Sequence, residues 1–131
     1  MTPHGLIDCL ARLARLTAPT AAQIAAATGF DLSLSEEDET CNGLRIFREL
    51  RLPDGRCVEL LYLPPQGEWT LVFREDSGDI IDPALRWGDL QTLQMSPTTK
   101  GYAILCRAPL STILTASTPS NRLETISVRP D

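Results

Sequence analysis

Histidine and lysine are almost absent from this 131-residue chain. His4 is the only histidine and Lys100 is the only lysine. A serine or cysteine nucleophile that depends on a histidine base therefore has a single candidate base, close to the N-terminus. Cys9 follows five residues later, a spacing that does not place two side chains on one face of a helix. The sequence thus predicts a protein that is not an enzyme.

The motifs that hold cofactors and metals are missing as well. The chain has no glycine-rich phosphate loop, no dinucleotide fingerprint, no HExxH pair and no CxxC pair. We therefore expect no cofactor and no metal. Asp76, Asp79 and Asp82 recur every three residues around a glycine. Turn and helix-cap roles account for Asp76 and Asp82, and whether the three carboxylates bind a cation stays open at this point.

Long apolar runs do not occur either. No run reaches the roughly eighteen apolar residues that a membrane helix needs. Asp8, Arg12 and Arg15 interrupt the leucines near the N-terminus, unlike the apolar core of a secretory signal. These patterns predict a cytoplasmic protein that does not bind membranes.

Positive charge is scarce relative to negative charge. Twelve basic residues face 17 acidic ones, which gives a net charge of −5 and a pI of about 4.8. Nucleic acids and anionic membranes select basic surfaces, so we expect no nucleic-acid partner and favour a protein partner with a basic surface. The length fits one domain over residues 1–131.

What the chain does have is a region of alternating apolar and polar residues over 43–75. Its period of two predicts three consecutive antiparallel strands, separated by turns at Pro53-Asp54-Gly55 and at residues 64–67. In the first strand the alternation places one apolar row on one face and Phe47 on the other. That row consists of Leu44, Ile46, Leu50 and Leu52, and Arg48 interrupts it, which indicates a bend there.

Two short helices are expected before these strands. Leu6, Leu10 and Leu13 form an apolar stripe in a first helix over about 4–16. Thr20 and Gln23 have the spacing of a capping box for a second helix over about 21–28. The stretch LTAPTAAQIAAATGF resembles the first half of the helix-turn-helix motif of bacterial regulators. The segment that follows it is acidic, which would repel DNA phosphates.

That acidic segment is the candidate binding site. It contains Glu36, Glu37, Asp38 and Glu39, and we interpret it either as a solvated connector or as a surface that meets a basic partner. Further along the chain, 82–93 is a possible helix, 102–107 and 123–129 favour strands, and 110–116 is expected to be a strand or a short helix. The fold class is therefore α+β, with two short N-terminal helices packed on a mainly antiparallel sheet of about five or six strands, and with a possible helix between strands three and four.

Two families of small acidic binding proteins resemble this chain. Bacterial immunity and antitoxin proteins are similar in size, charge and sheet content, which implies an inhibitor that occludes a toxin protein. Type III secretion chaperones are similar in the order of helix and strands over residues 4–75, which implies binding of an effector protein. Those chaperones commonly end in a helix, whereas LETISV predicts a final strand here. We place the immunity function first, the chaperone second and an enzyme of unrecognised type third.

Overall fold

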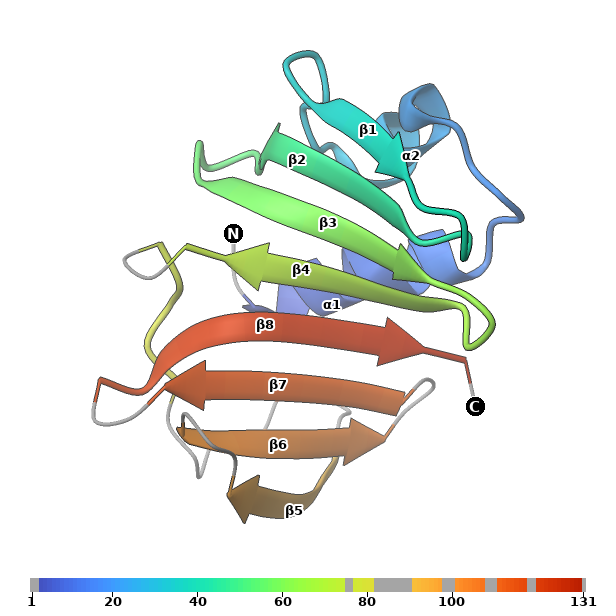
Figure 1. Cartoon of the computed structure of the whole chain (residues 1–131). Coiled ribbons are helices and arrows are strands. Elements are labelled where there is room, and N and C mark those ends of the chain that lie inside the picture. The colour runs from blue at the N-terminus through green and yellow to red at the C-terminus, as the bar shows by residue number, and fades with distance from the viewer. Residues whose placement is uncertain are drawn as a thin grey trace.

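The computed structural model describes residues 3–74, 77–81, 91–97, 101–107, 111–117 and 120–130. Two helices, α1 (Pro3–Ala14) and α2 (Ala21–Thr28), open the chain. The strands are β1 (Glu36–Glu39), β2 (Arg45–Arg51), β3 (Cys57–Leu63), β4 (Glu68–Phe73), β5 (Gln91–Pro97), β6 (Gly101–Arg107), β7 (Ser111–Ser117) and β8 (Arg122–Arg129). All eight form one antiparallel sheet in the order β1-β2-β3-β4-β8-β7-β6-β5 (Figure 1).

The α+β class and the two helices on a mainly antiparallel sheet are confirmed. Within the described residues the sheet has eight strands, because the acidic segment and Gln91–Pro97 also pair as strands. Leu93, expected near the end of a helix, lies in β5. The rest of that possible helix, residues 82–90, lies outside the described residues.

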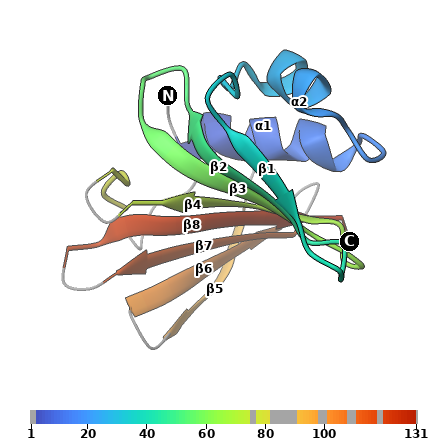
Figure 2. The same ribbon diagram turned by 45° about the horizontal axis from the view of Figure 1, so that its top comes forward.

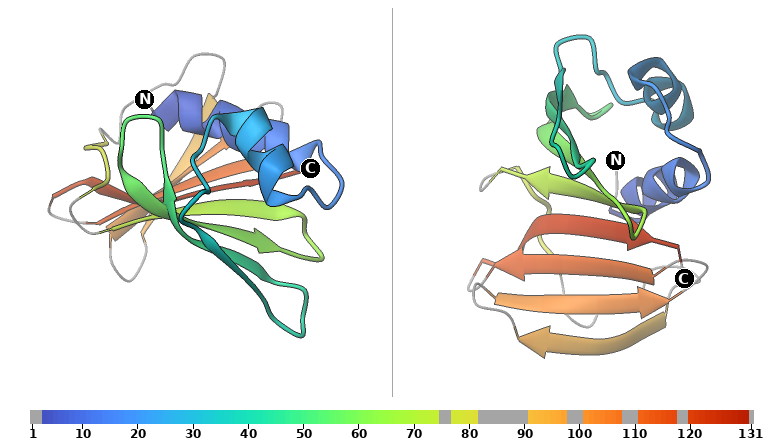
Figure 3. Two further views of the ribbon diagram at one scale, coloured as in Figure 1. Left: turned by 90° about the horizontal axis from the view of Figure 1, so that it is seen from above. Right: turned by 45° about the vertical axis from the view of Figure 1, so that its right-hand side comes forward.

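Both helices cover the same face of the sheet, and β1, β2 and β3 curve towards that side (Figures 2 and 3). The predicted apolar stripe of α1 is confirmed, because Leu6, Leu10 and Leu13 are completely buried. In α2 the Thr20 side chain accepts a hydrogen bond from the Gln23 backbone, and the Gln23 side chain accepts one from the Thr20 backbone. This capping box fixes where α2 begins.

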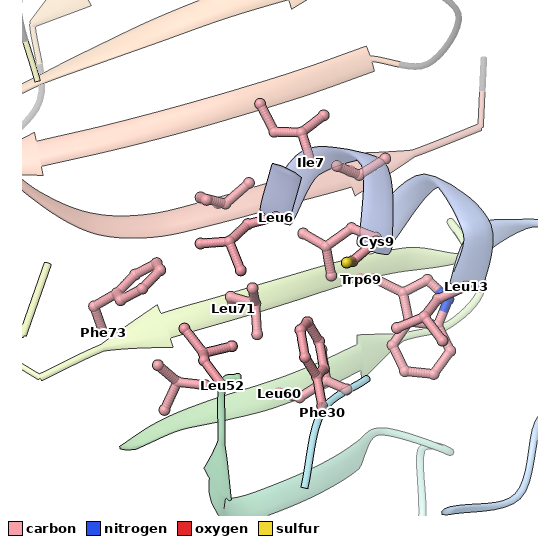
Figure 4. Close-up of a cluster of buried hydrophobic side chains, with 14 of the residues drawn as sticks. Leu6, Ile7, Cys9, Leu13, Phe30, Leu52, Leu60, Trp69, Leu71 and Phe73 are labelled. Carbon is pink, nitrogen blue, oxygen red and sulfur yellow. The ribbon is translucent and has the colours of Figure 1, made fainter. Parts of the chain in front are cut away.

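The core lies between α1 and the covered face of β2, β3, β4 and β8 (Figure 4). Trp69 is the largest fully buried side chain, and its ring centroid lies 4.7 Å from that of Tyr62. Phe30, just after α2, is also buried. Aromatic and leucine side chains from both layers therefore fill the space between the helices and the sheet.

A β-bulge at Arg48 and Glu49 interrupts β2, and it corrects the predicted apolar row. The register shifts between Phe47 and Leu50, and Glu49 has a φ of 55°. Phe47 and Leu50 are therefore both buried on the covered face, while Ile46 is only half-buried. The prediction that Ile46 shares a face with Leu50 is wrong, because one extra residue in a strand reverses the alternation.

The opposite face of the sheet carries half-buried side chains, and no described helix or strand lies over it (Figure 2). Leu61, Val72 and Ile113 from β3, β4 and β7 are on this face. Among the described residues, no helix has the length and apolar character needed to cross a membrane.

Two arginines hold residues 77–81 against the sheet through hydrogen bonds and an ion pair. Arg56 donates to the carbonyl of Ser77 and forms an ion pair with Asp79 at 3.2 Å. Arg122 donates to the carbonyl of Gly78 at 2.7 Å. The backbone of Asp79 also accepts a hydrogen bond from Leu123 at 2.8 Å, so this segment is held against the start of β8.

The turn between β2 and β3 contains a carboxylate whose ionisation favours the folded state. Burial of Asp54 acts to raise its pKa, but hydrogen bonds from the Arg56 side chain and backbone outweigh this effect and lower the pKa below 3.8. Because the pKa is lower in the folded state than in the unfolded state, the ionised carboxylate stabilises the fold at pH values above the unfolded pKa. This stabilisation is lost as the pH falls through the folded pKa.

We expect Asp54→Asn to lower the free energy of unfolding at pH 7 by less than about 1 kcal/mol, because the ion pair is near the surface. The difference between wild type and variant should shrink as the pH falls below the ordinary pKa of 3.8, because Asp54 then takes up a proton in the unfolded chain before it does so in the folded protein. Urea unfolding at pH 7 and near pH 3 measures both values, with Glu68→Gln as a control. An undiminished difference at the lower pH would assign the effect to turn geometry instead of charge.

Candidate functional site: the acidic edge strand

The four predicted site residues form β1, an edge strand of the sheet, and β5 is the strand at the other edge (Figure 1). We name Glu36, Glu37, Asp38 and Glu39 the acidic edge. All four side chains are exposed. The segment is predicted from the sequence as a solvated connector. Its side chains are exposed as expected, but its backbone is a β-strand and not a loop. The segment also forms no second helix of a helix-turn-helix motif.

Local hydrogen bonds on both sides hold β1 in place. Before the strand, Asp31 pairs with Arg51 as an isolated bridge, and the Asp31 side chain accepts a hydrogen bond from Ser33 at 2.9 Å. Hydrogen bonds from Ser33 lower the pKa of Asp31. After the strand, the Gly43 backbone donates to the carbonyl of Thr40 at 3.0 Å, with Gly43 at a φ of 81°. This turn reverses the chain into β2.

Two of the four acids form ion pairs with arginines of β2. Arg45 contacts Glu37 at 2.6 Å, and Arg48 contacts Asp38. The Arg45 side chain is only 15% exposed, and its guanidinium lies 5.1 Å from the centre of the Phe47 ring. A guanidinium over an aromatic ring gains a cation–π contribution. Arg45 therefore connects the acidic edge to the core.

Glu36 and Glu39 form no ion pair with any described residue. They are the first and last residues of β1, so unneutralised negative charge remains at both ends of the strand. Sequence reasoning identified the acidic segment from its charge. The division into paired and unpaired acids depends on the register of β1 against β2, which the sequence pattern did not reveal.

Two hollows meet at the bulge of β2, and both are lined by Arg48 and Glu49. The first hollow, of about 190 Å³, is completed by Leu34 and Glu36. The second, of about 220 Å³, extends across β3 and β4 and includes Cys57 and Arg74. Sequence reasoning missed these hollows, and its only indication of them was the interruption of the apolar row by Arg48.

Among the described residues, the other side chains considered for chemistry form no metal site. The described residues contain no group of three or more histidine, cysteine or acidic side chains placed to hold a metal. Asp79 pairs with Arg56, whereas Asp76 and Asp82 lie outside the described residues. Cys9 is buried and donates to the carbonyl of Thr28, and its burial raises the pKa of the thiol. Cys9 therefore has a structural environment.

This arrangement suits electrostatic recognition by an exposed sheet edge. Charges at the rim of an interface act mainly on the rate of association and on the choice of partner. Comparison of the whole chain with known proteins finds no matching family model, no matching curated protein and no matching solved structure.

Proposed function

We propose that this protein is a cytoplasmic inhibitor of the immunity or antitoxin type, which occludes a toxin protein by binding a basic surface of it. The observation that carries the proposal is the exposure of four consecutive acids on the edge strand β1, two of which form no ion pair with any described residue. A net charge of −5 adds a long-range attraction for a basic partner.

The geometry of the acidic edge favours binding over simple solvation. Arg45 is nearly buried and holds Glu37 beside the core, so the strand that carries the charges has a defined position before it meets a partner. A surface that is already ordered loses less conformational entropy on binding. Glu36 and Glu39 have no intramolecular partner to give up among the described residues.

A type III secretion chaperone is the second candidate function. The half-buried face opposite the helices, with Leu61 and Val72, supports it because partly apolar surface on a sheet can pack against a segment of an effector protein. The last described strand of the chain, β8, lies between β4 and β7, and this departs from the C-terminal helix of those chaperones. The identity of a co-purified partner separates the two functions: a toxin supports the first and a secreted effector the second.

We expect Glu36→Lys combined with Glu39→Lys to reduce the association rate with the partner by about tenfold and to weaken its salt dependence, because electrostatic steering raises such rates by one to three orders of magnitude. These two acids are chosen because reversing Glu37 would also break its ion pair with Arg45. The partner is recovered by pull-down from the source cell, and binding is measured by surface plasmon resonance at two salt concentrations.

The matched control is Glu68→Lys combined with Glu124→Lys. It changes the net charge by the same amount but lies on β4 and β8. We expect its effect on the association rate to be much smaller. Equal effects of the two double variants would show that only the total charge matters, and unchanged rates in the first would exclude the acidic edge from the interface.

A further inference from the structure

One side of the β1 backbone pairs with no strand of the described part of the chain. β1 is at the end of the strand order, and among the described strands only β2 pairs with it. The Thr40 backbone donates to the carbonyl of Leu44 at 2.9 Å, which fixes the phase of the ladder. Because hydrogen-bonded and non-hydrogen-bonded positions alternate along an antiparallel pair, Glu37 and Glu39 direct their backbone N–H and C=O groups away from β2. These groups are a template for another strand.

The first hollow lies beside the start of this free edge. Leu34 offers an apolar surface there, because the residue is 70% exposed. Glu36 and Glu49 add two carboxylates that form no ion pair with the described residues, while Arg48 is engaged by Asp38 and lies 3.9 Å from Glu59. An aliphatic surface next to two carboxylates matches an arginine or lysine side chain, which has an apolar stem and a charged head.

We propose that an extended basic segment of a partner protein pairs with the free edge of β1 as a ninth strand, and that one of its arginine or lysine side chains enters the first hollow. This inference rests on the proposed function and specifies the form of the partner's binding segment. The free edge offers backbone groups for pairing with the segment. The acids without ion pairs favour basic residues in it, and the first hollow holds one of its side chains as an anchor.

A second copy of this chain does not suit the same edge. Pairing β1 with another β1 would bring Glu36, Glu37, Asp38 and Glu39 of one molecule against the same acids of the other. Like charges opposite one another across strands are destabilising. The acidic edge therefore disfavours self-association and favours a segment of opposite charge.

The test compares Glu39→Pro with Glu39→Ala. Both variants remove one charge that has no ion pair among the described residues, but only proline removes the outward N–H, and proline is tolerated at such positions of edge strands. The probe is a synthetic peptide of alternating arginine and threonine, followed by fluorescence anisotropy. We expect wild type and Glu39→Ala to bind within a few-fold of each other, and Glu39→Pro to bind about tenfold more weakly than Glu39→Ala through the lost backbone bond and the obstructed edge.

A second pair of variants tests the hollow. Glu49→Gln should weaken binding of the arginine peptide about threefold, since it removes one carboxylate from the hollow, whereas Glu124→Gln on β8 should leave it unchanged. Circular dichroism and thermal unfolding of each variant confirm that the fold is kept.

The possible failures are distinguishable. Equal binding by Glu39→Pro and Glu39→Ala would overturn strand pairing, and the proposed function would then stand or fall on the association rates of the Glu36→Lys/Glu39→Lys variant with its recovered partner. No binding of the peptide to wild type would also overturn this inference. If Glu39→Pro weakens binding but Glu49→Gln does not, strand pairing stands and the first hollow is not part of the binding site.

Discussion

Phe47→Ala is expected to lower the free energy of unfolding by about 3–5 kcal/mol, the range for removal of a large buried aromatic side chain. Phe47 is 1% exposed and belongs to the core between the helices and the sheet. Its ring also supports the guanidinium of Arg45. Because native domains are stable by only about 5–15 kcal/mol, this single change should remove a large part of the total. Urea denaturation followed by circular dichroism measures it.

Ile46→Ala is the matched control for this prediction. Ile46 is the preceding residue of the same strand, but it is half-buried on the uncovered face. We expect its replacement to cost less than half as much as that of Phe47. A larger cost for Ile46→Ala would mean that the faces of β2 are reversed and that the bulge is not where the structure places it.

Gly78→Ala is expected to destabilise the protein by about 3 kcal/mol, the upper end of the usual penalty for inserting atoms into a packed site. A Cβ at Gly78 would lie 2.0 Å from the carbonyl oxygen of Leu123. That oxygen belongs to the backbone of β8 and cannot move aside without disturbing the hydrogen bonds that hold residues 77–81 to β8. Thermal unfolding and hydrogen exchange of the Ile81 and Leu123 amides, which donate to Asn121 and Asp79, measure the effect.

Gly55→Ala provides the contrast. Gly55 has a φ of 92°, and a Cβ there would meet no atom within 4 Å, so its cost is that of an unfavourable backbone conformation, about 1–2 kcal/mol. We expect Gly78→Ala to be the more damaging of the two. The reverse order would show that the close approach of Gly78 to β8 is not maintained in solution.

The parts of the fold that depend on local chemistry could be predicted from the sequence. The α2 boundaries follow from the Thr20–Gln23 capping box and from Gly29 at the C-terminal end, where φ is 76°. The turn at Gly55, the strand β2 before it and the strands β3 and β4 after it follow from the alternation of apolar and polar residues and from the turn residues. These elements agree with the structure because neighbouring residues alone determine them.

The parts that depend on distant contacts could not be predicted. The bulge at Glu49 adds one residue to β2 without a glycine to mark it, and it exchanges the faces of Ile46 and Phe47. The β1 strand has four acids that are poor strand formers. β1 is supported by its backbone pairing with β2 and by the ion pairs that Arg45 and Arg48 form with Glu37 and Asp38. These contacts become visible only when the two strands are seen paired. The candidate site was thus found by its charge, while its edge position and its hollows were not.

The place of β8 determines when the sheet is completed during synthesis. Although β8 is the last of the described strands in sequence order, it lies between β4 and β7 and pairs Trp69 with Val128. Until the residues of β8 have left the ribosome, the strands that carry the acidic edge and the strands β5 to β7 remain two unjoined pieces, each with an open inner edge. The strand that carries the acidic edge is therefore synthesised well before β8, the strand that joins the two pieces of the sheet.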